Sequence, residues 1–462
     1  MPAAQTTPTE SPMCIGKTLV IGLGKTGMSC ARYLRQQGCS VAVKDSREAP
    51  PGLAQARAEL PDVALLLGGL DASAMSAADE IVVSPGVPLS EPALRAAMEG
   101  GTPVIGDVEL FARAATAPVV AITGSNGKST VTTLLGLIAR NAGRKVAVGG
   151  NLGEPGLDLL SPDVELYVLE LSSFQLESTS SLKVEAATVL NLSADHMDRY
   201  PDLAAYGAAK ARVFKHAEIA VVNRDDPAAA ALADGVARQV GFTLGVPASG
   251  DYGLVQADGQ TWMARGERAG FKRLLPVSQV LLPGTHNRAN CLAALALADA
   301  CGLPMASASQ VFATFPGLPH RSELVHEHGG VRWINDSKGT NPGATIAALT
   351  GLVPDPATCK AVLIAGGDGK GADFTTLADV VRQRARAAVL IGSDAPRLAQ
   401  ALADSVPFEV ADDMDEAVRI AAELARPGDS VVLSPACASF DMFDDYQHRG
   451  RVFAEAVARW VQ

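Results

Sequence analysis

The stretch VVAITGSNGKSTVTTLLGLIAR, residues 119–140, decides the fold of this chain. It begins as a run of aliphatic and β-branched residues, turns through a glycine-rich segment and continues as a long helical pattern. A strand that passes through a Gly-Lys-Ser turn into a helix is typical of a phosphate-binding loop at the edge of a parallel sheet. The stretch therefore predicts a nucleoside triphosphate site in an α/β domain.

The loop within this stretch supplies the groups that a triphosphate needs. Backbone amides and the ammonium of Lys128 would hold the β- and γ-phosphates, while the hydroxyl of Ser129 would bind Mg²⁺. The loop is a variant, because the pattern G-x-x-x-x-G-K-S/T expects a glycine where Ile122 stands. The predicted triphosphate-binding residues are Gly124, Ser125, Asn126, Gly127, Lys128, Ser129 and Thr130.

Short strand-like runs alternate with Ala-rich helical segments on both sides of this loop, which predicts parallel βαβ units. The pattern loosens into hairpin-like strands only between residues 241 and 275, and a proline-marked segment, FPGLPHRSE at 315–323, reads as a linker. We therefore expect an α/β protein of three domains, each with a mostly parallel sheet flanked by helices. They are a Rossmann-like N-terminal domain (1–112), a P-loop ATPase central domain (113–317) and a Rossmann-like C-terminal domain (318–462).

Length and composition agree with a folded protein of several domains. The 462 residues suffice for three domains of ~100–200 residues, and 48% hydrophobic with 19% charged residues excludes a disordered chain. The net charge of −11 disfavours a nucleic-acid partner. The scattered cysteines contain no C-x-x-C pair, and no signal peptide or membrane span is visible, so we predict a cytoplasmic protein. The first dozen residues read as a flexible tail.

A second glycine-rich turn, GLGKTG at residues 22–27, stands between a strand-like run and a helical segment. Such glycines let backbone amides approach a diphosphate, and Asp45, which closes the next strand, could bind a ribose hydroxyl. The turn SPG at residues 84–86 follows another strand and points to the same crevice. Two alternatives stay open at this point: a tight turn without ligand and an NAD-dependent dehydrogenase.

Polar side chains also follow two strands of the central domain. The run YVLEL carries Glu170 as its fourth residue, and Asp195 and His196 follow the run TVLNL. An acidic residue at the end of a strand beside a phosphate-binding loop is the usual second anchor of Mg²⁺. Glu170 fits that role, although a solvated carboxylate and an ordinary turn histidine remain open readings.

The motifs TGSNGKST, ELSSFQLE and NLSADHMDRY, taken in this order, resemble the Mur ligase family of ATP-dependent amide-forming enzymes. SSFQLE and DHMDRYP resemble the members of the family that add D-glutamate. The resemblance continues through GTHNRANCLAAL, GLPHR, INDSKGTNPGAT, AGGDGKGADF and LSPACASFD, and thus covers nearly the whole chain. It implies ATP, UDP-N-acetylmuramoyl-L-alanine and D-glutamate as substrates, two Mg²⁺ ions, an acyl-phosphate intermediate and a place in peptidoglycan precursor synthesis.

The resemblance also implies a role for individual residues. Lys128, His196 and Lys210 would act at the reacting groups. Lys210 matches the family lysine that CO₂ carbamylates, although the sequence alone reads it as a surface lysine of an Ala-rich helix. The implied Mg²⁺ ligands are Ser129, Glu170, His196 and carbamylated Lys210. Beyond the phosphate loop, the residues implied for ATP are Asn287, Asn290, Arg321 and Asp336.

The remaining implied residues bind the other two substrates. Those for the nucleotide sugar are Gly24, Lys25, Thr26, Asp45, Ser46, Arg47, Ser84, Gly86, Asn151 and Gln175. Those for D-glutamate are Lys338, Thr340, Lys370, Ser439, Phe440 and Tyr446, the last standing where the family commonly has phenylalanine. A ligase that adds another amino acid and a P-loop nucleotide sensor without chemistry are the competing hypotheses.

Overall fold

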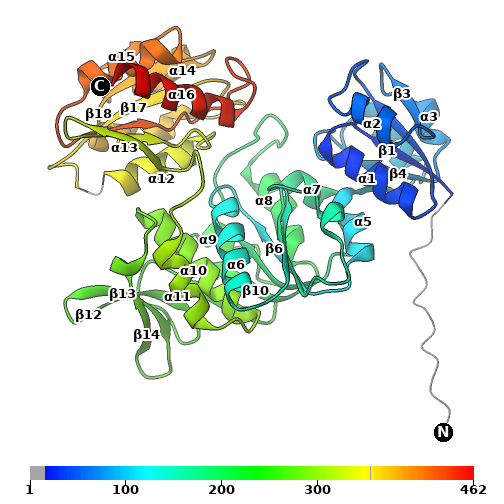
Figure 1. The fold of residues 1–462 in the computed structure, drawn as a ribbon, viewed down its shortest axis with the longest axis horizontal. Coiled ribbons are helices and arrows are strands. Elements are labelled where there is room, and N and C mark those ends of the chain that lie inside the picture. Colours follow the sequence, from blue (N-terminus) through cyan, green and yellow to red (C-terminus); the bar gives the residue numbers. More distant parts are fainter. Residues whose placement is uncertain (1–15, 354, 462) are drawn as a thin grey trace.

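The computed structural model describes residues 16–353 and 355–461. The predicted flexible tail lies outside the described residues. Three sheets follow one another along the chain, and the first and last domains both sit against the central one (Figure 1). The predicted three-domain α/β architecture is confirmed, whereas the domain boundaries at residues 112 and 317 stay predictions. No helix in the described part of the chain is long and apolar enough to cross a membrane.

The N-terminal sheet is fully parallel, with the strand order β3-β2-β1-β4-β5. Its order reverses between β1 and β4, and ligands of such sheets bind at the carboxyl ends of the strands at that point. The strands are β1 (Lys17–Ile21), β2 (Ser40–Asp45), β3 (Ala64–Leu67), β4 (Glu80–Val83) and β5 (Val104–Gly106), and the helices are α1 (Lys25–Gln36), α2 (Leu53–Glu59), α3 (Ala72–Ser76), α4 (Pro92–Glu99) and α5 (Asp107–Ala114).

The central sheet has nine strands in the order β14-β13-β12-β11-β10-β9-β6-β8-β7. Its strands are parallel from β7 to β12, and β13 and β14 add an antiparallel edge in the region where hairpins were predicted. The strands are β6 (Val119–Thr123), β7 (Val146–Gly150), β8 (Leu166–Glu170), β9 (Val184–Val189), β10 (Ala217–Asn223), β11 (Gln239–Phe242), β12 (Tyr252–Ala257), β13 (Gln260–Gly266) and β14 (Phe271–Pro276). The helices are α6 (Lys128–Asn141), α7 (Ser173–Glu177), α8 (Leu203–Ala211), α9 (Pro227–Ala231), α10 (Thr285–Ala300) and α11 (Met305–Thr314).

The C-terminal sheet has the order β15-β16-β20-β17-β18-β19, with only β15 antiparallel. The strands are β15 (Glu323–His328), β16 (Val331–Asn335), β17 (Ala361–Gly366), β18 (Ala385–Ile391), β19 (Phe408–Val410) and β20 (Ser430–Leu433). The helices are α12 (Pro342–Leu352), α13 (Ala378–Arg384), α14 (Ala395–Leu402), α15 (Met414–Leu424) and α16 (Tyr446–Trp460).

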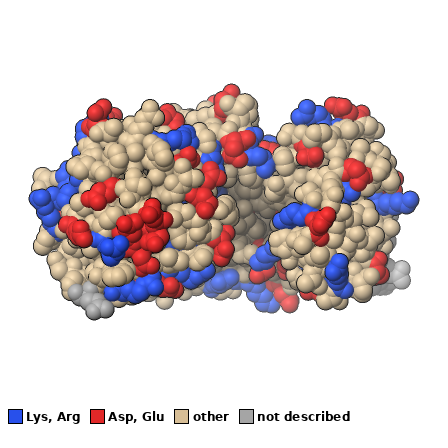
Figure 2. All heavy atoms as spheres, turned by 90° about the horizontal axis from the view of Figure 1, so that it is seen from above, with Lys and Arg blue, Asp and Glu red and all other residues tan. Residues whose placement is uncertain are grey.

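Helices cover the sheets because the strands are apolar on both faces, as parallel strands are when helices flank them. Every residue of β6, β8, β17 and β20 is buried. Polar side chains gather instead where strands end and loops begin. The space-filling view shows a hollow between the C-terminal domain on the left and the N-terminal domain on the right (Figure 2), and the cavities described next lie at these loops.

Candidate active site

The glycine-rich loop between β6 and α6 is held in shape by the neighbouring strand end. Ser125 Oγ donates to Ser193 O and accepts from Ser193 N, each at 2.9 Å, and Asn126 N donates to Asn191 Oδ1 at 2.8 Å. Gly127 has a φ of 84°, and a Cβ there would lie 2.5 Å from Asn290 Oδ1. Glycine is required at this position because a side chain would meet the helix that carries Asn290.

Lys128, the first residue of α6, folds back over the loop. Its Nζ donates to Gly124 O at 2.8 Å and to Ser125 O at 2.9 Å. Burial and the charges of Arg321 and Lys370 lower the pKa of Lys128, while Glu170 and Asp195 oppose the shift. The ammonium is thus held at the mouth of the loop, where it could bind the phosphates of a nucleotide.

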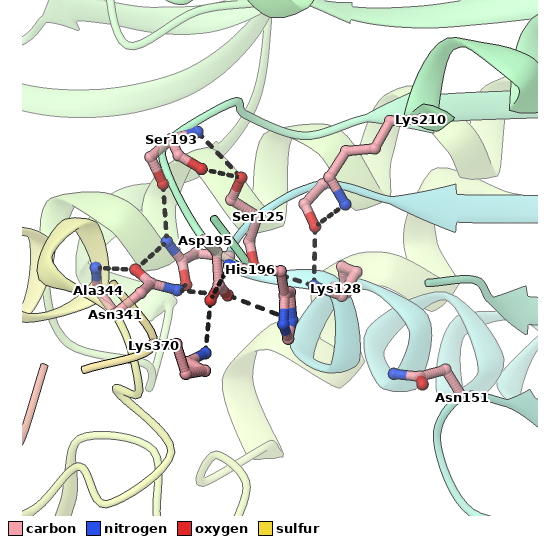
Figure 3. Close-up of polar contacts among 12 residues, drawn as sticks. Ser125, Lys128, Asn151, Ser193, Asp195, His196, Lys210, Asn341, Ala344 and Lys370 are labelled. Carbon is pink, nitrogen blue, oxygen red and sulfur yellow. Dashed lines mark hydrogen bonds and ion pairs between the residues drawn. The ribbon is translucent and has the colours of Figure 1, made fainter. Parts of the chain in front are cut away.

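Asp195 is a hub that joins the central domain to the C-terminal domain (Figure 3). Lys370 Nζ lies 2.6 Å from Asp195 Oδ1, and Asn341 Nδ2 donates to Asp195 Oδ2 at 3.1 Å. Asn341 also exchanges amide hydrogen bonds of 3.2 Å with Asn126 in the phosphate loop. Burial alone would raise the pKa of Asp195, but the charges of Lys370 and His196 outweigh it and lower this pKa.

His196 stands beside this hub in a left-handed backbone conformation, with a φ of 58°. Its Nε2 lies 3.8 Å from Asp195 Oδ2. Burial lowers the pKa of His196 to about 4, against the opposing charge of Asp195. The imidazole is therefore neutral near pH 7, which is the form that can bind a metal ion.

Glu170, at the end of β8, faces the same space. Its Oε1 accepts from Asn151 Nδ2 at 2.7 Å, whereas its Oε2 is buried without a hydrogen-bond partner in the described structure. Within the described residues, no group of three His, Cys, Asp or Glu side chains is arranged to hold a metal ion. An orphaned buried oxygen suits Mg²⁺, which needs only one or two protein ligands when phosphates and water complete its shell.

Lys210 lies in the last turn of α8 and is 1% exposed, so the reading as a surface lysine is wrong. Its Nζ donates to Gly124 O at 3.0 Å and lies 4.4 Å from the centre of the Tyr206 ring. Burial, followed by the charge of Lys128, lowers the pKa of Lys210 well below its usual value. Both effects favour the neutral amine over the ammonium.

These groups share one cavity of about 320 Å³ with residues from the C-terminal domain. Lys338 lies 4.0 Å from the centre of the Tyr446 ring, and burial together with the charge of Arg321 lowers its pKa to about 8. Phe440 is 75% exposed at the rim. The predicted residues that line this cavity are Ser125, Asn126, Gly127, Lys128, Asn151, Glu170, His196, Lys210, Arg321, Lys338, Thr340, Lys370, Ser439, Phe440 and Tyr446.

A second cavity, also of about 320 Å³, opens on the other side of the phosphate loop. Arg321 reaches across the domain junction and donates to Ser129 Oγ at 2.6 Å. Asp336 is buried, and burial raises its pKa to about 6 although Ser434 Oγ donates to it at 2.7 Å. The predicted residues lining this cavity are Asn126, Gly127, Thr130, Asn287, Asn290, Arg321, Asp336 and Lys338. Gly124, in the loop, and Ser129, in the first turn of α6, line neither of these two cavities.

A third cavity, of about 460 Å³, lies at the carboxyl end of the N-terminal sheet. All ten residues predicted for the nucleotide sugar line it: Gly24, Lys25, Thr26, Asp45, Ser46, Arg47, Ser84, Gly86, Asn151 and Gln175. The Asp45 carboxylate accepts from Leu23 N at 2.7 Å and from two guanidinium nitrogens of Arg47 at 2.8 and 2.9 Å. These hydrogen bonds, that of Arg47 above all, lower the pKa of Asp45 to about 2. In this structure Asp45 thus orients Arg47 rather than offering a free oxygen.

Sequence reasoning missed Asn341 as a functional residue. It caps α12 by accepting from Ala344 N at 2.9 Å, and the same side chain touches Asn126 and Asp195. The dipeptide Asn-Pro at 341–342 signals a helix start, so the cap was visible in the sequence. The second contact was not, because it joins two domains.

The chain matches three families of domains in order along its length. They are described as the Mur ligase MurD-like N-terminal domain, over residues 16–106, the Mur ligase middle domain, over residues 122–298, and the Mur ligase glutamate ligase domain, over residues 320–437. Together these matches span most of the three sheets described above.

Similar proteins extend over nearly the full length. The UDP-N-acetylmuramoylalanine–D-glutamate ligase of Nitrosococcus oceani is 54% identical over 447 residues, covering 96% of this chain and 97% of that protein. The ligase of the same name from Pseudomonas savastanoi pv. phaseolicola is 53% identical over 439 residues, covering 95% and 97%. Among solved structures, MurF from Acinetobacter baumannii has a TM-score of 0.61 at 17% identity, covering 98% of this chain and 95% of its own. MurC from Thermotoga maritima has a TM-score of 0.59 at 18% identity, covering 96% and 99%. These two likenesses show a shared fold.

Proposed function

The chain belongs to the Mur ligase family, and on that premise we propose that it joins D-glutamate to UDP-N-acetylmuramoyl-L-alanine at the expense of ATP, in the synthesis of peptidoglycan precursors. The observation that carries the proposal is the central cavity. It brings a phosphate loop, an orphaned carboxylate oxygen and two lysines of the C-terminal domain to one space. A nucleotide, an acyl group and a dicarboxylic amino acid could meet there.

The reaction needs two group transfers. A carboxylate is a poor electrophile, so one of its oxygens first attacks the γ-phosphorus of ATP, the bond from that phosphorus to the bridging oxygen breaks, and ADP leaves. The amine of the amino acid then attacks the carbonyl carbon of the acyl phosphate, phosphate leaves with the electron pair of the C–O bond, and the amine loses a proton. Lys128 and Arg321 supply positive charge where these anions meet, which is how phosphoryl transfer is chiefly catalysed. No protein nucleophile is required.

Two Mg²⁺ ions fit the residues present. Ser129 would hold one ion beside the triphosphate, and Glu170 and His196 would hold the other beside the acyl group. When bound, the ions neutralise phosphate charge and so lower the barrier to anionic attack. The orphaned Glu170 Oε2 and the neutral imidazole of His196 support this assignment.

We further propose that Lys210 is carbamylated. The neutral amine attacks CO₂, a nitrogen–carbon bond forms, and a proton is released, so that an ammonium becomes a carboxylate. A buried ammonium so close to Lys128 would repel a cation, whereas a carbamate offers hard oxygen ligands for the second Mg²⁺. The low pKa of Lys210 supports the first step.

The other two substrates are assigned to cavities by charge and size. Lys338 and Lys370 suit the two carboxylates of D-glutamate, with Thr340, Ser439, Phe440 and Tyr446 around them. The third cavity, with its glycine-rich turn at residues 22–27, suits a uridine diphosphate. Asn151 lines both cavities and would lie along the path of the muramoyl group.

The ATP assignment rests on the second cavity, where Asn287 and Asn290 offer amides to a base and Arg321 and Asp336 come from the C-terminal domain. The domain ranges 1–112, 113–317 and 318–462 would then correspond to nucleotide-sugar, ATP and amino-acid binding. We propose that the enzyme works in the cytoplasm and has no nucleic-acid partner.

Phosphate release tests the proposal directly. Release should require ATP, Mg²⁺, UDP-N-acetylmuramoyl-L-alanine and D-glutamate together, and L-glutamate should be inert. Faster release with a diamino acid or L-alanine would instead indicate a ligase for another amino acid. Hydrolysis of ATP at the same rate without the other substrates would indicate a nucleotide sensor.

A further inference from the structure

Arg449, in α16, is the largest charged side chain among the fully buried residues of the described chain, and the proposed chemistry does not use it. It is 0% exposed. Its guanidinium donates to Ser337 O at 2.8 Å, Ser337 Oγ at 3.0 Å, Cys437 O at 3.1 Å and Ala438 O at 3.2 Å, and Gly366 O lies 3.5 Å away. All of these acceptors are neutral. Burial lowers the pKa of Arg449 to about 10, so the group is charged at neutral pH.

Burying a guanidinium without an ion pair is unfavourable in free energy. Taking its charge out of water costs free energy that only a paired carboxylate or a full set of hydrogen bonds offsets, and an apolar side chain of similar volume is commonly as stable or more so. In the described part of the chain Arg449 donates no hydrogen bond to a carboxylate, although the charges of Asp441 and Asp336 favour its charged form. Its five N–H donors each meet one of the five acceptors above, which offsets the cost of burial and at the same time fixes the backbone that carries those acceptors.

The acceptors of Arg449 belong to three loops that leave adjacent strands. Ser337 follows β16, Gly366 ends β17, and Cys437 and Ala438 follow β20, and the sheet order places β20 between β16 and β17. One side chain therefore ties together the carboxyl-end loops of three neighbouring parallel strands, which is where such sheets bind ligands.

The same three loops carry the residues assigned above to the amino acid. Lys338 and Thr340 stand one and three residues after Ser337, Lys370 stands four residues after Gly366, and Ser439 follows Ala438. These residues line the central cavity, whereas Arg449 does not. Arg449 therefore lies behind the cavity wall and touches the backbone that shapes it.

Ala438 O accepts from Arg449 and from Asp368 N, the latter at 3.1 Å, and the two hydrogen bonds together fix the direction of the next amide. All described peptide bonds are trans, and in a trans peptide the C=O and the following N–H point in opposite directions. The N–H of Ser439 is thus turned away from Arg449, and Ser439 lines the cavity. A cation on the carbonyl side polarises the peptide and strengthens that N–H as a donor to an anion.

Two of these loops also hold strained backbone. Lys370 has a φ of 50° and Ala436 a φ of 59°, both in the left-handed region that side chains disfavour. Such conformations persist only where the surrounding contacts hold them. The hydrogen bond from Arg449 to the carbonyl of Cys437, the residue after Ala436, supplies one such contact.

We propose that Arg449 is a positioning residue for the amino-acid substrate: it holds three loops so that Lys338, Lys370 and the Ser439 N–H converge on the carboxylates of a dicarboxylic amino acid, and its buried charge attracts them. The inference rests on the proposed function, because it takes D-glutamate as the occupant of the central cavity.

The test compares the full-length wild type with two variants. Arg449→Met removes the charge, and Arg449→Lys keeps the charge but loses the planar set of guanidinium N–H donors. The KM for D-glutamate should rise about 10- to 100-fold in Arg449→Met and less in Arg449→Lys, as expected when charge-assisted positioning is lost. The KM for ATP and for the nucleotide sugar should stay unchanged. The rate of ADP formation in a single turnover without D-glutamate should also be unchanged, because that half-reaction does not use the amino acid.

Matched controls in the same domain separate positioning from stability. Arg386 pairs with Asp429 at 2.6 Å, and Ser430 accepts from Arg332 at 3.0 Å, both at the opposite, amino ends of the strands. Arg386→Met and Ser430→Ala should lower the melting temperature without raising the KM for D-glutamate. If Arg449→Met does not fold, Ser337→Ala removes one acceptor of Arg449, and it should raise the same KM by a smaller factor.

An unchanged KM for D-glutamate in these variants would overturn the inference. The inference would also be overturned if all three KM values rose together while the rate of the half-reaction and the melting temperature fell, since that pattern indicates general destabilisation. Failure of the proposed function is distinguishable, because the wild type itself would then show no phosphate release that depends on D-glutamate.

Discussion

The N-terminal and C-terminal domains join the central domain in different ways. On the N-terminal side, one apolar cluster crosses the junction, from Val20 and Leu23 in the first domain to Val119 and Leu157 in the second. In the described structure the C-terminal domain keeps its buried apolar clusters to itself. Shared apolar burial excludes water from a junction and makes it rigid, whereas junctions between separate cores are free to move by default.

The polar contacts at the two junctions differ in the same sense. Near the N-terminal domain, Gln175 Nε2 donates to Asp107 Oδ2 at 2.9 Å, with both side chains buried. One exposed contact, from Lys25 Nζ to Gly153 O at 2.9 Å, also lies there, beside the third cavity. At the C-terminal domain, Lys370 contacts Asp195 and Arg321 contacts Ser129, and these groups face the cavities proposed for substrates. A ligand that binds Lys370 or Arg321 must therefore exchange with contacts that now join the two domains. We therefore expect a rigid junction between the N-terminal and central domains, and a junction between the central and C-terminal domains whose arrangement depends on bound ligands.

The largest effect should come from Lys128→Ala, at the junction between the central and C-terminal domains. Phosphate release should fall on the order of 10²–10³-fold or more, by analogy with loss of one transition-state donor. Binding of the nucleotide sugar, measured by calorimetry, should stay nearly intact because its cavity lies on another sheet. Lys145→Ala is the control, since Lys145 is exposed in the same domain. Near-normal turnover in Lys128→Ala would contradict the role of the loop.

Lys210→Ala should give the next largest effect and separate a carbamate from a structural lysine. Activity should fall on the order of 10²-fold, and acetate should restore part of it by supplying the missing oxygen ligand. The exposed Lys215 provides the control, because Lys215→Ala should be silent with or without acetate. Full activity of Lys210→Ala in CO₂-depleted buffer would return Lys210 to a packing role.

Movement of the C-terminal domain on ligand binding tests whether the two junctions differ in rigidity. ATP would contact Asn290 in the central domain and Arg321 beyond the linker, so one ligand favours a single arrangement of the two domains. Adding ATP and the nucleotide sugar should change the distance between fluorescent labels on the central and C-terminal domains. Labels on the N-terminal and central domains should keep their distance. An equal change in both pairs, or in neither, would break the comparison.

The smallest effect concerns Asp107, at the junction between the N-terminal and central domains, and is an effect on stability. Burial raises the pKa of Asp107 from 3.8 to about 6, against hydrogen bonds that lower it. The folded state therefore binds this proton more tightly than the unfolded state, and the contribution of Asp107 to the free energy of unfolding falls as pH rises through this window. By linkage the loss reaches at most about 3 kcal/mol above pH ~6.

Asp107→Asn removes the titration, so its stability relative to wild type should increase as pH rises from about 4 to about 7. Urea unfolding at several pH values measures this difference. Asp163→Asn is the control, because the Asp163 side chain is 83% exposed. A pH-independent difference between Asp107→Asn and wild type would show that this carboxyl does not titrate in the fold.

The sequence by itself determined the elements and their order. The strand, loop and helix at residues 119–140 were predictable because the signal is local: a buried apolar run, glycines at a tight turn, and a helical pattern directly after it. The three alternating segments predicted three mostly parallel sheets for the same reason. The glycine-rich turns also fixed where phosphates would bind, since strand ends and helix starts meet there whatever the rest of the chain does.

Only the tertiary structure decided how these parts work on one another. The contact of Lys370 with Asp195 joins residues 175 positions apart, and that of Arg449 with Ser337 joins residues 112 apart. The burial of Lys210, the orphaned oxygen of Glu170 and the apolar cluster that spans two domains likewise depend on distant segments meeting. A periodic pattern reports which face of an element is buried but not what covers it, and pKa shifts and positioning depend on that covering.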